Sequence, residues 1–405
     1  MSATGVSLDL ARDLRAICGE EQVLESDKKA SPVISVSPGS ADEVAAILRL
    51  ANLHGFSIAP VGGHADVATP KADVLLRMHR LTAVEHYDPA DLTVGIGAGM
   101  TVSQLNALVA EGKLMFACDP AFPEQSTIGG VLAAAKHGPM RHGFGGVRDF
   151  CIGVRFVTGD GRKAKGGGHV VKNVAGYDMM KLLIGSYGTL AVITSASFKL
   201  FPAPRQTRTF LAEFGSWQEA LKFRDLVVRS PLSPMCIELV SPAARKLMRP
   251  EMADARWVIC VRGAGSDAVL ARYRGELGSA ITRALNGEDE RQMWNALEQF
   301  PSDAEYHTVS LFAPPTELSA ILQLLQDLSG DAAYIGRVGL GHLLIAKPSS
   351  DNEGKDGTWF DSLRGRLPKS VQVTSDWQAI DSVPSMRAVK QALDPNNVLR
   401  GRELR

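Results

Sequence analysis

Three glycine-rich turns in the first half of the chain carry the residue types and spacing that best fit ligand chemistry. They are Pro60–His64 (PVGGH), Ser126–Gly130 (STIGG) and Gly185–Thr189 (GSYGT). Because glycine has no Cβ, it permits positive φ and lets backbone N–H groups approach a ligand closely. Such N–H groups, and those at a helix N-terminus, suit a pyrophosphate. Two such loops from opposite sides could enclose a dinucleotide, whereas each cluster alone could equally be a tight turn.

A fourth glycine cluster imitates the Rossmann dinucleotide fingerprint but departs from it. Gly95–Gly99 (GIGAG) precedes an expected helix, yet the fingerprint GxGxxG needs a third glycine inside that helix. The sixth position is Met100 counted from Gly95 and Val102 counted from Gly97. The sequence contains no GK[ST] triplet, so a Walker-type phosphate loop is also excluded.

Regular elements flank these turns and would hold them in place. The run 56–61 (FSIAPV) predicts a strand before the first turn, and 129–137 (GGVLAAAKH) predicts a helix of small residues at the second. A strand is expected directly after the third turn. A further helix is expected from Ser40 to His54, because Ser40 and Glu43 have the spacing of a capping box. Each turn therefore adjoins an element that can fix its backbone.

Composition and charge restrict the class of protein to which this chain can belong. The chain has 405 residues, of which 45% are apolar and 22% charged, so general disorder is excluded. Its 44 basic and 44 acidic residues cancel, which leaves no overall charge excess for nucleic acid or an anionic membrane. We therefore expect a globular protein of two or three domains that does not bind nucleic acid.

The cysteines and the hydropathy pattern indicate where the protein works. Its five cysteines are far apart and form no CxxC pair, which disfavours a disulfide scaffold, a zinc site and an iron–sulfur cluster. The N-terminal stretch does not read as a secretory signal, and nowhere do 18 apolar residues run together. We expect a cytoplasmic protein without a membrane span; peripheral attachment to a membrane through a partner is an alternative.

The segment Pro202–Arg205 (PAPR) marks the expected domain boundary, because proline interrupts helices and strands alike and the pattern changes after it. Glycine-rich turns dominate before it, while strands alternate with longer helices after it. We expect a first domain over 1–202, a smaller α+β domain over 203–380 and a C-terminal tail over 381–405. The tail contains an expected amphipathic helix that Asp394–Pro395 ends.

Four segments resemble, in order and spacing, the FAD-binding domain of the vanillyl-alcohol-oxidase/p-cresol-methylhydroxylase (PCMH) type. They are PVGGH at 60–64, DLTVGIGAGMTVSQL at 91–105, the stretch 119–162 from DPAFPEQSTIGG to VTGDGR, and the stretch 166–202 that contains KNVAGYDMMKLLIGSYGTL. Within this superfamily the last segment is most similar to the FAD-binding subunits, or E chains, of glycolate oxidases. The tail MRAVKQALDPNNVL also resembles the C-terminal segment of this family.

The resemblance implies an α+β fold and FAD as the cofactor. The fold would be a PCMH-type FAD-binding domain of two subdomains, followed by a smaller α+β (ferredoxin-like) cap domain and a tail that returns to the first domain. By position, the resemblance assigns cofactor contacts to the first and second turns, to a stretch around the ribityl chain and flavin, and to the third turn. The residues concerned are Pro60, Val61, Gly62, Gly63, His64, Pro120, Ser126, Thr127, Ile128, Gly129, Gly130, Gly138, Arg141, Gly145, Asp149, Gly188 and Ile193.

The first turn departs from the family pattern at His64–Asp66, where a further Gly-Thr pair is common. His64 follows Gly62–Gly63 as the flavin-linked histidine does in relatives of the berberine-bridge type, so a covalent 8α-histidyl flavin is one alternative. Bicovalent relatives also carry a cysteine near the position of Gln125. Non-covalent FAD, with His64 hydrogen-bonded to phosphate or solvent, is the other alternative. Asp66 would add an unfavourable negative charge near a pyrophosphate unless it points away.

Several polar side chains near the expected flavin segments have two interpretations each. His137, His142 and His169 could lie near a substrate carboxylate or be neutral histidines satisfied in turns. Arg141 and Arg148 could bind a carboxylate or phosphate through two hydrogen bonds, or pair with Asp149 or Asp160 as structural ions.

The segment that would carry substrate oxidation is altered. The catalytic D chains of glycolate oxidase and related 2-hydroxy-acid dehydrogenases carry HxGDGNxH and a later Glu-His pair, which bind a divalent metal and the substrate. The corresponding stretch here is Gly336–Leu343 (GRVGLGHL), which keeps one histidine, His342, and lacks the acidic residue. Since one histidine cannot form a catalytic metal site, no metal site and no catalytic residue is assigned.

The resemblance therefore implies an FAD-dependent oxidoreductase subunit of a glycolate (or D-lactate) dehydrogenase complex. Its partners would be a catalytic flavoprotein D chain and an iron–sulfur F chain, and its substrate a small 2-hydroxy acid. Two alternatives stay open. The chain could be a self-sufficient FAD-dependent oxidoreductase acting on a small hydroxy acid, or a structural subunit that has lost flavin turnover.

Overall fold

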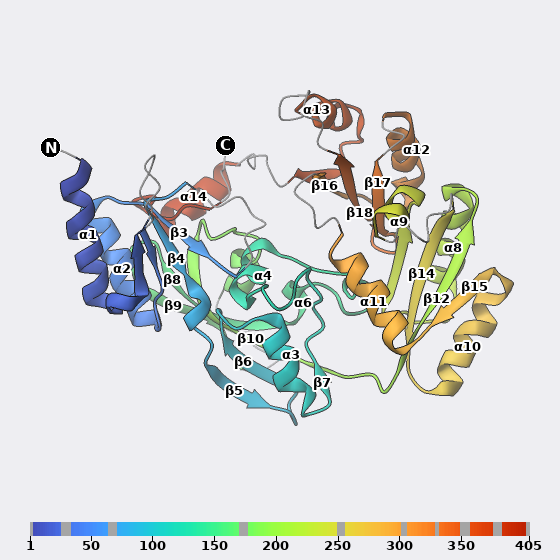
Figure 1. Ribbon diagram of the computed structural model, residues 1–405, viewed down its shortest axis with the longest axis horizontal. Coiled ribbons are helices and arrows are strands. Elements are labelled where there is room, and N and C mark those ends of the chain that lie inside the picture. The colour runs from blue at the N-terminus through green and yellow to red at the C-terminus, as the bar shows by residue number, and fades with distance from the viewer. Residues whose placement is uncertain are drawn as a thin grey trace. The chain divides into compact units, whose positions relative to one another are not determined.

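The chain folds into two units in the computed structural model (Figure 1). Unit 1 consists of Met1–His137, Gly145–Ala203 and Ala379–Arg405, and unit 2 of Gly138–Phe144 and Pro204–Gln378. The structure describes residues 3–25, 34–63, 71–169, 177–248, 256–300, 306–328, 332–348, 357–375 and 383–401.

A four-stranded sheet and two helices form the first layer of unit 1. The strands follow the order β1-β2-β4-β3, with β2 and β3 both parallel to β4. Their bounds are β1 Val23–Glu25, β2 Ile34–Val36, β3 Ile58–Val61 and β4 Val74–Arg77, and the helices are α1 Ala3–Cys18 and α2 Ala41–His54. Ser40 caps α2 as predicted, because its hydroxyl accepts from the Glu43 N–H at 3.1 Å. The Glu43 carboxylate accepts from the Gly39 N–H, one residue earlier than in a capping box.

A five-stranded antiparallel sheet forms the second layer of unit 1, in the order β5-β6-β10-β8-β9. Its strands are β5 Val84–Asp88, β6 Thr93–Gly97, β8 Cys151–Thr158, β9 Lys163–Gly167 and β10 Ala191–Lys199. The helices here are α3 Val102–Ala110, α4 Ile128–Ala134, α6 Val147–Phe150 and α7 Met179–Leu183, and a short ribbon joins β7 Leu114–Met115 to β11 Phe201–Pro202. Strand β8 begins at Cys151, directly after α6, and the Asp149 carboxylate caps α6 by accepting from the Gly146 N–H.

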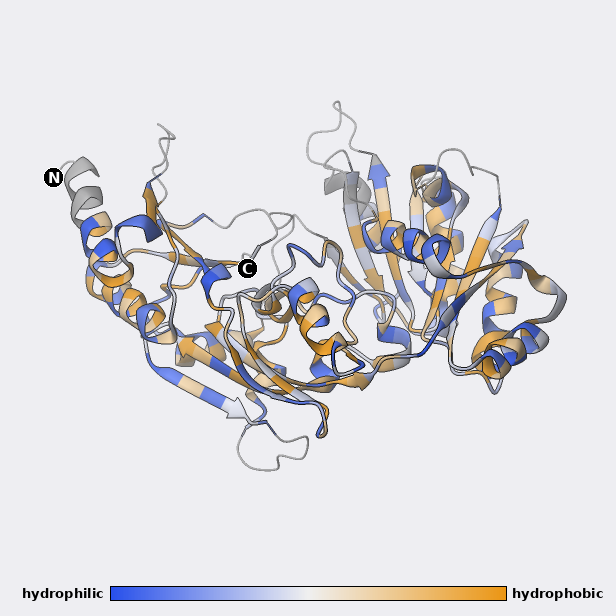
Figure 2. Ribbon diagram, turned by 60° about the horizontal axis from the view of Figure 1, so that its bottom comes forward, coloured by the Kyte–Doolittle hydropathy of each residue, from blue (hydrophilic) through white to orange (hydrophobic). Residues whose placement is uncertain are grey.

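Strand β10 lies between two hydrophobic cores of unit 1. Ile193 belongs to the core of the second sheet and Val192 to that of the first, since successive strand side chains point to opposite faces. All residues from Ala191 to Phe198 are buried. Figure 2 shows hydrophobic residues on helices and strands alike, alternating with hydrophilic ones along each element.

The C-terminal segment also belongs to unit 1. Helix α14 spans Pro384–Leu393, so it ends where the Asp394–Pro395 pair predicted. Beyond it, the Ile58 N–H donates to Val398 O at 2.9 Å and the Arg400 N–H donates to Ile58 O at 2.7 Å. The chain end therefore runs parallel to β3.

Unit 2 is built on an eight-stranded sheet of the order β15-β12-β14-β13-β17-β18-β16-β19, in which every neighbouring pair is antiparallel. Its strands are β12 Thr207–Phe214, β13 Cys236–Val240, β14 Trp257–Ala264, β15 Ile281–Leu285, β16 Tyr306–Phe312, β17 Ala333–Arg337, β18 His342–Pro348 and β19 Gln372–Ser375. Its helices are α5 Arg141–Phe144, α8 Trp217–Arg229, α9 Pro242–Met248, α10 Asp267–Leu277, α11 Gly287–Glu298, α12 Leu318–Leu328 and α13 Gly357–Arg366. The α+β fold class that the sequence predicted is confirmed.

A tight turn joins β17 to β18 in unit 2. Gly341 has a φ of 73°, and a Cβ there would lie 1.8 Å from the Ala313 carbonyl oxygen. Among the described residues, no helix is both long and apolar enough to cross a membrane.

Candidate functional site

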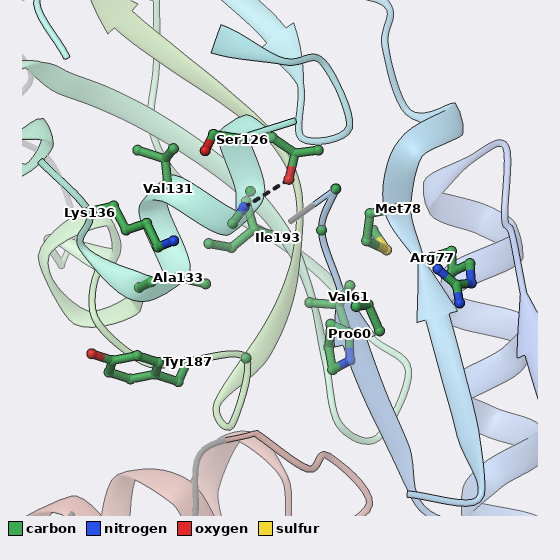
Figure 3. Close-up of a pocket in the computed structure, with 18 of the residues that line it drawn as sticks. Pro60, Val61, Arg77, Met78, Ser126, Val131, Ala133, Lys136, Tyr187 and Ile193 are labelled. Carbon is green, nitrogen blue, oxygen red and sulfur yellow. Dashed lines mark hydrogen bonds between the residues drawn. The ribbon is translucent and has the colours of Figure 1, made fainter. Parts of the chain in front are cut away.

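A pocket of about 240 Å³ opens in unit 1 where the three glycine-rich turns meet (Figure 3). The end of β3 forms one wall, the segment around α4 a second, and the start of β10 with the turn before it a third. The lining residues are Pro60, Val61, Gly62, Gly63, Leu75, Arg77, Met78, Ser126, Thr127, Gly129, Gly130, Val131, Ala133, Ala134, Lys136, Tyr187, Gly188, Ala191, Val192 and Ile193.

The first two turns press against each other, which only glycine permits. A Cβ at Gly63 would lie 2.1 Å from the Gln125 carbonyl oxygen, and one at Gly62 would lie 2.6 Å from Thr127 Oγ1. Real Cβ contacts do not approach so closely, so a side chain at either position would force the loops apart. Gly62 and Gly63 therefore set the distance between the two walls.

The backbone N–H groups at the start of α4 already have acceptors within the protein. The Ile128 N–H donates to Met100 O at 2.9 Å, the Gly129 N–H to Ala98 O at 2.8 Å, and the Gly130 N–H to Thr127 Oγ1 at 3.3 Å, the bond drawn dashed in Figure 3. This corrects the expectation that this helix start would offer its N–H groups to a pyrophosphate. Instead, Gly129 and Gly130 contribute a surface without side chains.

The third turn is held in a left-handed backbone conformation. Tyr187 has a φ of 52° and Gly188 a φ of 75°, a region that glycine adopts freely and tyrosine adopts at some cost. Hydrogen bonds fix the turn to α4, since the Gly185 N–H donates to Leu132 O at 3.0 Å and the Tyr187 N–H to Ala133 O at 2.7 Å. This strained geometry brings Gly188 beside Pro60 of the first wall.

Two cations and no carboxylate line this pocket among the described residues. Lys136 follows α4, and Figure 3 shows its amine turned toward Val131 and Ile193. Arg77, at the end of β4, lies beyond Val61 and Met78 in the same view. Neither cation forms an ion pair with another described residue in the structure. The wall is therefore positively charged, which favours a phosphate-bearing ligand.

The structure brings together many of the residues assigned to the cofactor from the sequence. Those on the pocket wall are Pro60, Val61, Gly62, Gly63, Ser126, Thr127, Gly129, Gly130, Gly188 and Ile193. Pro120 and Ile128 are buried but do not line this pocket. His64, the alternative attachment point for flavin, lies outside the described residues, as do Ala65 and Asp66.

Four further assigned residues lie away from this wall. The Asp149 carboxylate caps α6, and Gly145, with a φ of 82°, packs against that same carboxylate. Gly138 and Arg141 belong to unit 2, where the Arg141 guanidinium lies 6.0 Å from the centre of the Phe312 ring. Asp149 therefore has a capping role in unit 1.

The three histidines considered as substrate contacts lie in different surroundings. The His137 ring contacts Ala135 O at 3.0 Å, and His169 contacts Ser197 Oγ at 3.1 Å. His142 lies in unit 2, where its ring packs so closely on Gly339 that a Cβ there would lie 2.4 Å from it. Burial lowers the pKa of His142, so its ring is neutral. The described geometry therefore fits histidines held in turns and strands.

The stretch that corresponds to HxGDGNxH forms the end of β17, a turn and the start of β18. Arg337 Nη1 lies 2.6 Å from His342 Nδ1, and Arg337 Nε lies 3.7 Å from the buried carboxylate of Glu238. A guanidinium therefore lies beside His342. Among the described residues, no group of three or more His, Cys, Asp or Glu side chains could hold a metal ion.

The pocket wall also contains residues that the sequence analysis did not assign. They are Leu75, Arg77, Met78, Val131, Ala133, Ala134, Lys136, Tyr187, Ala191 and Val192. Lys136 had a usable signal, because it directly follows a helix of small residues that begins in a glycine turn. Arg77 and Met78 had none, because the strand β4 reaches the pocket only through its parallel pairing with β3.

The wall fits one part of a dinucleotide. Ligand pockets usually measure about 300–1,000 Å³, and the 240 Å³ described here suits a pyrophosphate with an adjoining ribose more than a whole FAD. Close glycine walls leave room for the phosphate oxygens, and Lys136 supplies a positive charge. The residues present thus fit the diphosphate portion of the cofactor.

Comparisons with known proteins find relatives that match part of the chain. Residues 32–166 match the family of FAD binding domains. The glycolate oxidase subunit GlcE of Escherichia coli is 35% identical over 49% of this chain and 53% of its own length. A D-lactate dehydrogenase of Archaeoglobus fulgidus is 32% identical over 59% of this chain and 54% of its own length. The matched region thus spans about half the length of these curated relatives.

A solved structure shares the fold across nearly the whole chain. An alkyldihydroxyacetonephosphate synthase superposes with a TM-score of 0.74 over 96% of this chain and 85% of its own, at 17% identity. At that identity the likeness concerns the fold, which is the PCMH type that the sequence predicted. Residues 32–166, which carry the first two walls of the pocket, match the FAD binding domain, and FAD is the cofactor of this chain.

Proposed function

We propose that this chain is the FAD-binding subunit of an oxidoreductase complex that oxidises a small 2-hydroxy acid such as glycolate or D-lactate. The observation that carries the proposal is the pocket, whose glycine walls and unpaired Lys136 fit the diphosphate of FAD. The substrate class comes from the relatives named as a glycolate oxidase subunit and a D-lactate dehydrogenase.

The residues of this chain would bind and orient the cofactor. Bound FAD would supply the hydride acceptor for the oxidation of a 2-hydroxy acid to a 2-oxo acid. Gly62 and Gly63 let the two walls close on the diphosphate, and Lys136 neutralises part of its charge. Gly188, held against Pro60 by its left-handed turn, closes the third side. We assign the contacts of Pro60–Gly63, Ser126, Thr127, Gly129, Gly130, Gly188 and Ile193 to this role.

The cysteines of this chain favour an iron–sulfur centre on another subunit. All five are free, and Cys118, Cys151, Cys236 and Cys260 are buried. Burial raises the pKa of Cys151 and of Cys260 to about 12, so both are thiols near neutral pH. Because a cluster ligand must be a thiolate, these sites are poor ligands as they stand. We therefore propose that electrons leave through an iron–sulfur partner chain, with a catalytic flavoprotein as a third chain.

The test compares the isolated chain with the assembly it forms. The tagged chain is purified from its native host together with any bound proteins, and also alone after expression in a foreign host. Both samples are loaded with FAD and mixed with glycolate or D-lactate without oxygen while the flavin band is followed. The proposal expects bleaching by the assembly, flavin bound to the isolated chain, and iron and sulfide only in the assembly.

Each other result selects a different function. Bleaching of the isolated chain at the rate of the assembly would make it a self-sufficient FAD oxidoreductase. A colourless isolated chain that still assembles would make it a structural subunit. An isolated chain that binds FAD but captures no partner and bleaches with neither acid would overturn the proposal.

A further inference from the structure

The C-terminal segment Pro384–Gly401 contacts the third wall of the FAD pocket and strand β3, which leads into the first wall. Its last residues run beside β3, where Ile58 exchanges backbone hydrogen bonds with Val398 and Arg400 at 2.9 and 2.7 Å. Strand β3 continues directly into Gly62 and Gly63 of the first wall. The chain end therefore extends the sheet from which the first wall emerges.

Lys390 links this segment to the third wall. Its ammonium donates to the Thr189 carbonyl oxygen at 2.7 Å, to the Leu399 carbonyl oxygen at 3.1 Å and to the Asp394 carboxylate. Thr189 directly follows Tyr187 and Gly188, which line the pocket. The Lys390 side chain is 15% exposed and that of Asp394 is 0% exposed, so water competes little for these bonds.

Two further contacts hold the same arrangement. The Asp394 carboxylate accepts from the Val398 N–H at 2.9 Å and the Leu399 N–H at 2.8 Å, which fixes the bend after α14. Gly401 lies against the third wall, since a Cβ there would lie 2.1 Å from the Tyr187 carbonyl oxygen. The strained turn at Tyr187 is therefore held by the chain end on one side and by α4 on the other.

Helix α14 itself adds little apolar burial to this attachment. None of its residues from Pro384 to Leu393 is buried, and Val383 and Met386 are 51% and 39% exposed. Only Val398 and Leu399 enter the core. The segment is therefore held chiefly by the polar bonds of Lys390 and Asp394, and elements with few buried contacts open most easily.

We propose that Pro384–Gly401 is a brace for the FAD pocket, that FAD binding and docking of this segment stabilise each other, and that Lys390 is the positioning residue that couples them. Because such coupling is reciprocal, FAD must protect the segment as much as the segment tightens FAD binding. The proposal rests on FAD as the cofactor and not on the proposed substrate, so its test needs no turnover.

The test uses the full chain and its Lys390→Met variant, which keeps a stem of similar length but removes the donors. Lys163→Met is the matched control, because Lys163 also pairs with an aspartate of unit 1, Asp42, but does so at the surface. The FAD dissociation constant is measured by quenching of flavin fluorescence. Cleavage of the segment by a protease, with and without saturating FAD, is followed by mass spectrometry.

We expect Lys390→Met to weaken FAD binding by about tenfold or more, as befits buried charged hydrogen bonds, and Lys163→Met to leave it unchanged. In the wild-type chain FAD should slow cleavage within 384–401, and in Lys390→Met this protection should be largely lost. Gly401→Ala should also weaken FAD binding, since it displaces the Tyr187 carbonyl while the Lys390 bonds remain.

A purely structural role predicts a different result. Lys390→Met would then lower the melting temperature of the FAD-free chain while its FAD affinity stays at the wild-type value. That result, or cleavage of the wild-type segment at the same rate with and without FAD, would overturn the proposal. The protection experiment needs no variant, so it decides the question even if Lys390→Met does not fold.

Discussion

Gly63 and the Gln125 carbonyl oxygen lie so close that a Cβ at Gly63 would be 2.1 Å from that oxygen. The neighbouring clash, between Gly62 and Thr127 Oγ1, involves a side chain that can rotate, whereas Gln125 O is backbone. The separation of the first two pocket walls therefore depends most on the absence of a side chain at position 63.

Replacing Gly63 by alanine should open the pocket. We expect Gly63→Ala to weaken FAD binding by at least about tenfold, because the two loops must separate to admit the methyl group. Gly168→Ala is the control, since a Cβ there has no neighbour within 4 Å. Equilibrium dialysis against FAD measures both. Wild-type affinity in Gly63→Ala would show that the two walls do not hold the cofactor.

The charge of Lys136 should attract the cofactor diphosphate. We expect Lys136→Met to weaken FAD binding about three- to tenfold and to make it less sensitive to salt, because one charge–charge attraction is lost. Arg77→Met, which removes the other cation of the wall, should have the smaller effect because Arg77 lies farther from the third wall (Figure 3). Titrations at two salt concentrations compare the variants. Equal salt dependence in Lys136→Met and wild type would contradict this role.

Glu290 should stabilise unit 2 from within. Its buried carboxylate accepts from Thr207 and Thr209 hydroxyls at 2.7 and 2.8 Å and from Arg262 Nε at 3.2 Å. Glu290→Leu leaves the Arg262 charge without this partner, so we expect the free energy of unfolding to fall by about 3–5 kcal/mol. Glu288→Leu, on the exposed side of the same helix, should change little.

Denaturant unfolding followed by tryptophan fluorescence suits this comparison. All five tryptophans of the chain lie between positions 217 and 377, within unit 2, so the signal reports that unit. An equal loss of stability in Glu290→Leu and Glu288→Leu would mean that the buried network contributes nothing beyond a surface ion pair.

His142 should make unit 2 less stable in mild acid. Burial lowers its pKa from the ordinary 6.5, so below pH 6.5 the unfolded chain takes up a proton that the folded ring resists. The contribution of the neutral His142 ring to stability is therefore fully present above pH 6.5, and it declines as the pH falls toward the lowered pKa. His142→Asn should flatten that decline. Denaturant unfolding between pH 7 and pH 5, followed by tryptophan fluorescence, measures how the free energy of unfolding changes with pH. The same pH dependence in His142→Asn and in the wild type would contradict this role of His142.

The local signals of the sequence were sufficient for the elements around the pocket. The Ser40 cap, the strand before Gly62 and the end of α14 at Asp394 all follow from short-range rules of capping and backbone restriction. The residues of the three glycine turns that line one pocket were also identified, because the glycines that allow such close backbone contacts stand out in the sequence.

The remainder of the site depends on pairings that no local pattern records. Arg77 reaches the pocket because β4 pairs with β3, and Lys390 reaches Thr189 across 201 positions of the chain. The N–H groups of α4 could not be predicted as occupied, since their acceptors, Ala98 and Met100, come from the turn after β6. The capping role of Asp149 was not predicted either, because it depends on where α6 begins.

The central claim is that this chain binds FAD in the pocket between its glycine turns. The most direct measurement is the absorbance of the purified chain, incubated with excess FAD, freed of unbound flavin and then precipitated with acid. The account predicts stoichiometric flavin in the supernatant of the wild type and much less from Gly63→Ala. Flavin in the pellet would indicate a covalent bond between the flavin and the protein, and His64 would then be the residue to replace. Absence of flavin from both fractions of the wild type would contradict the account.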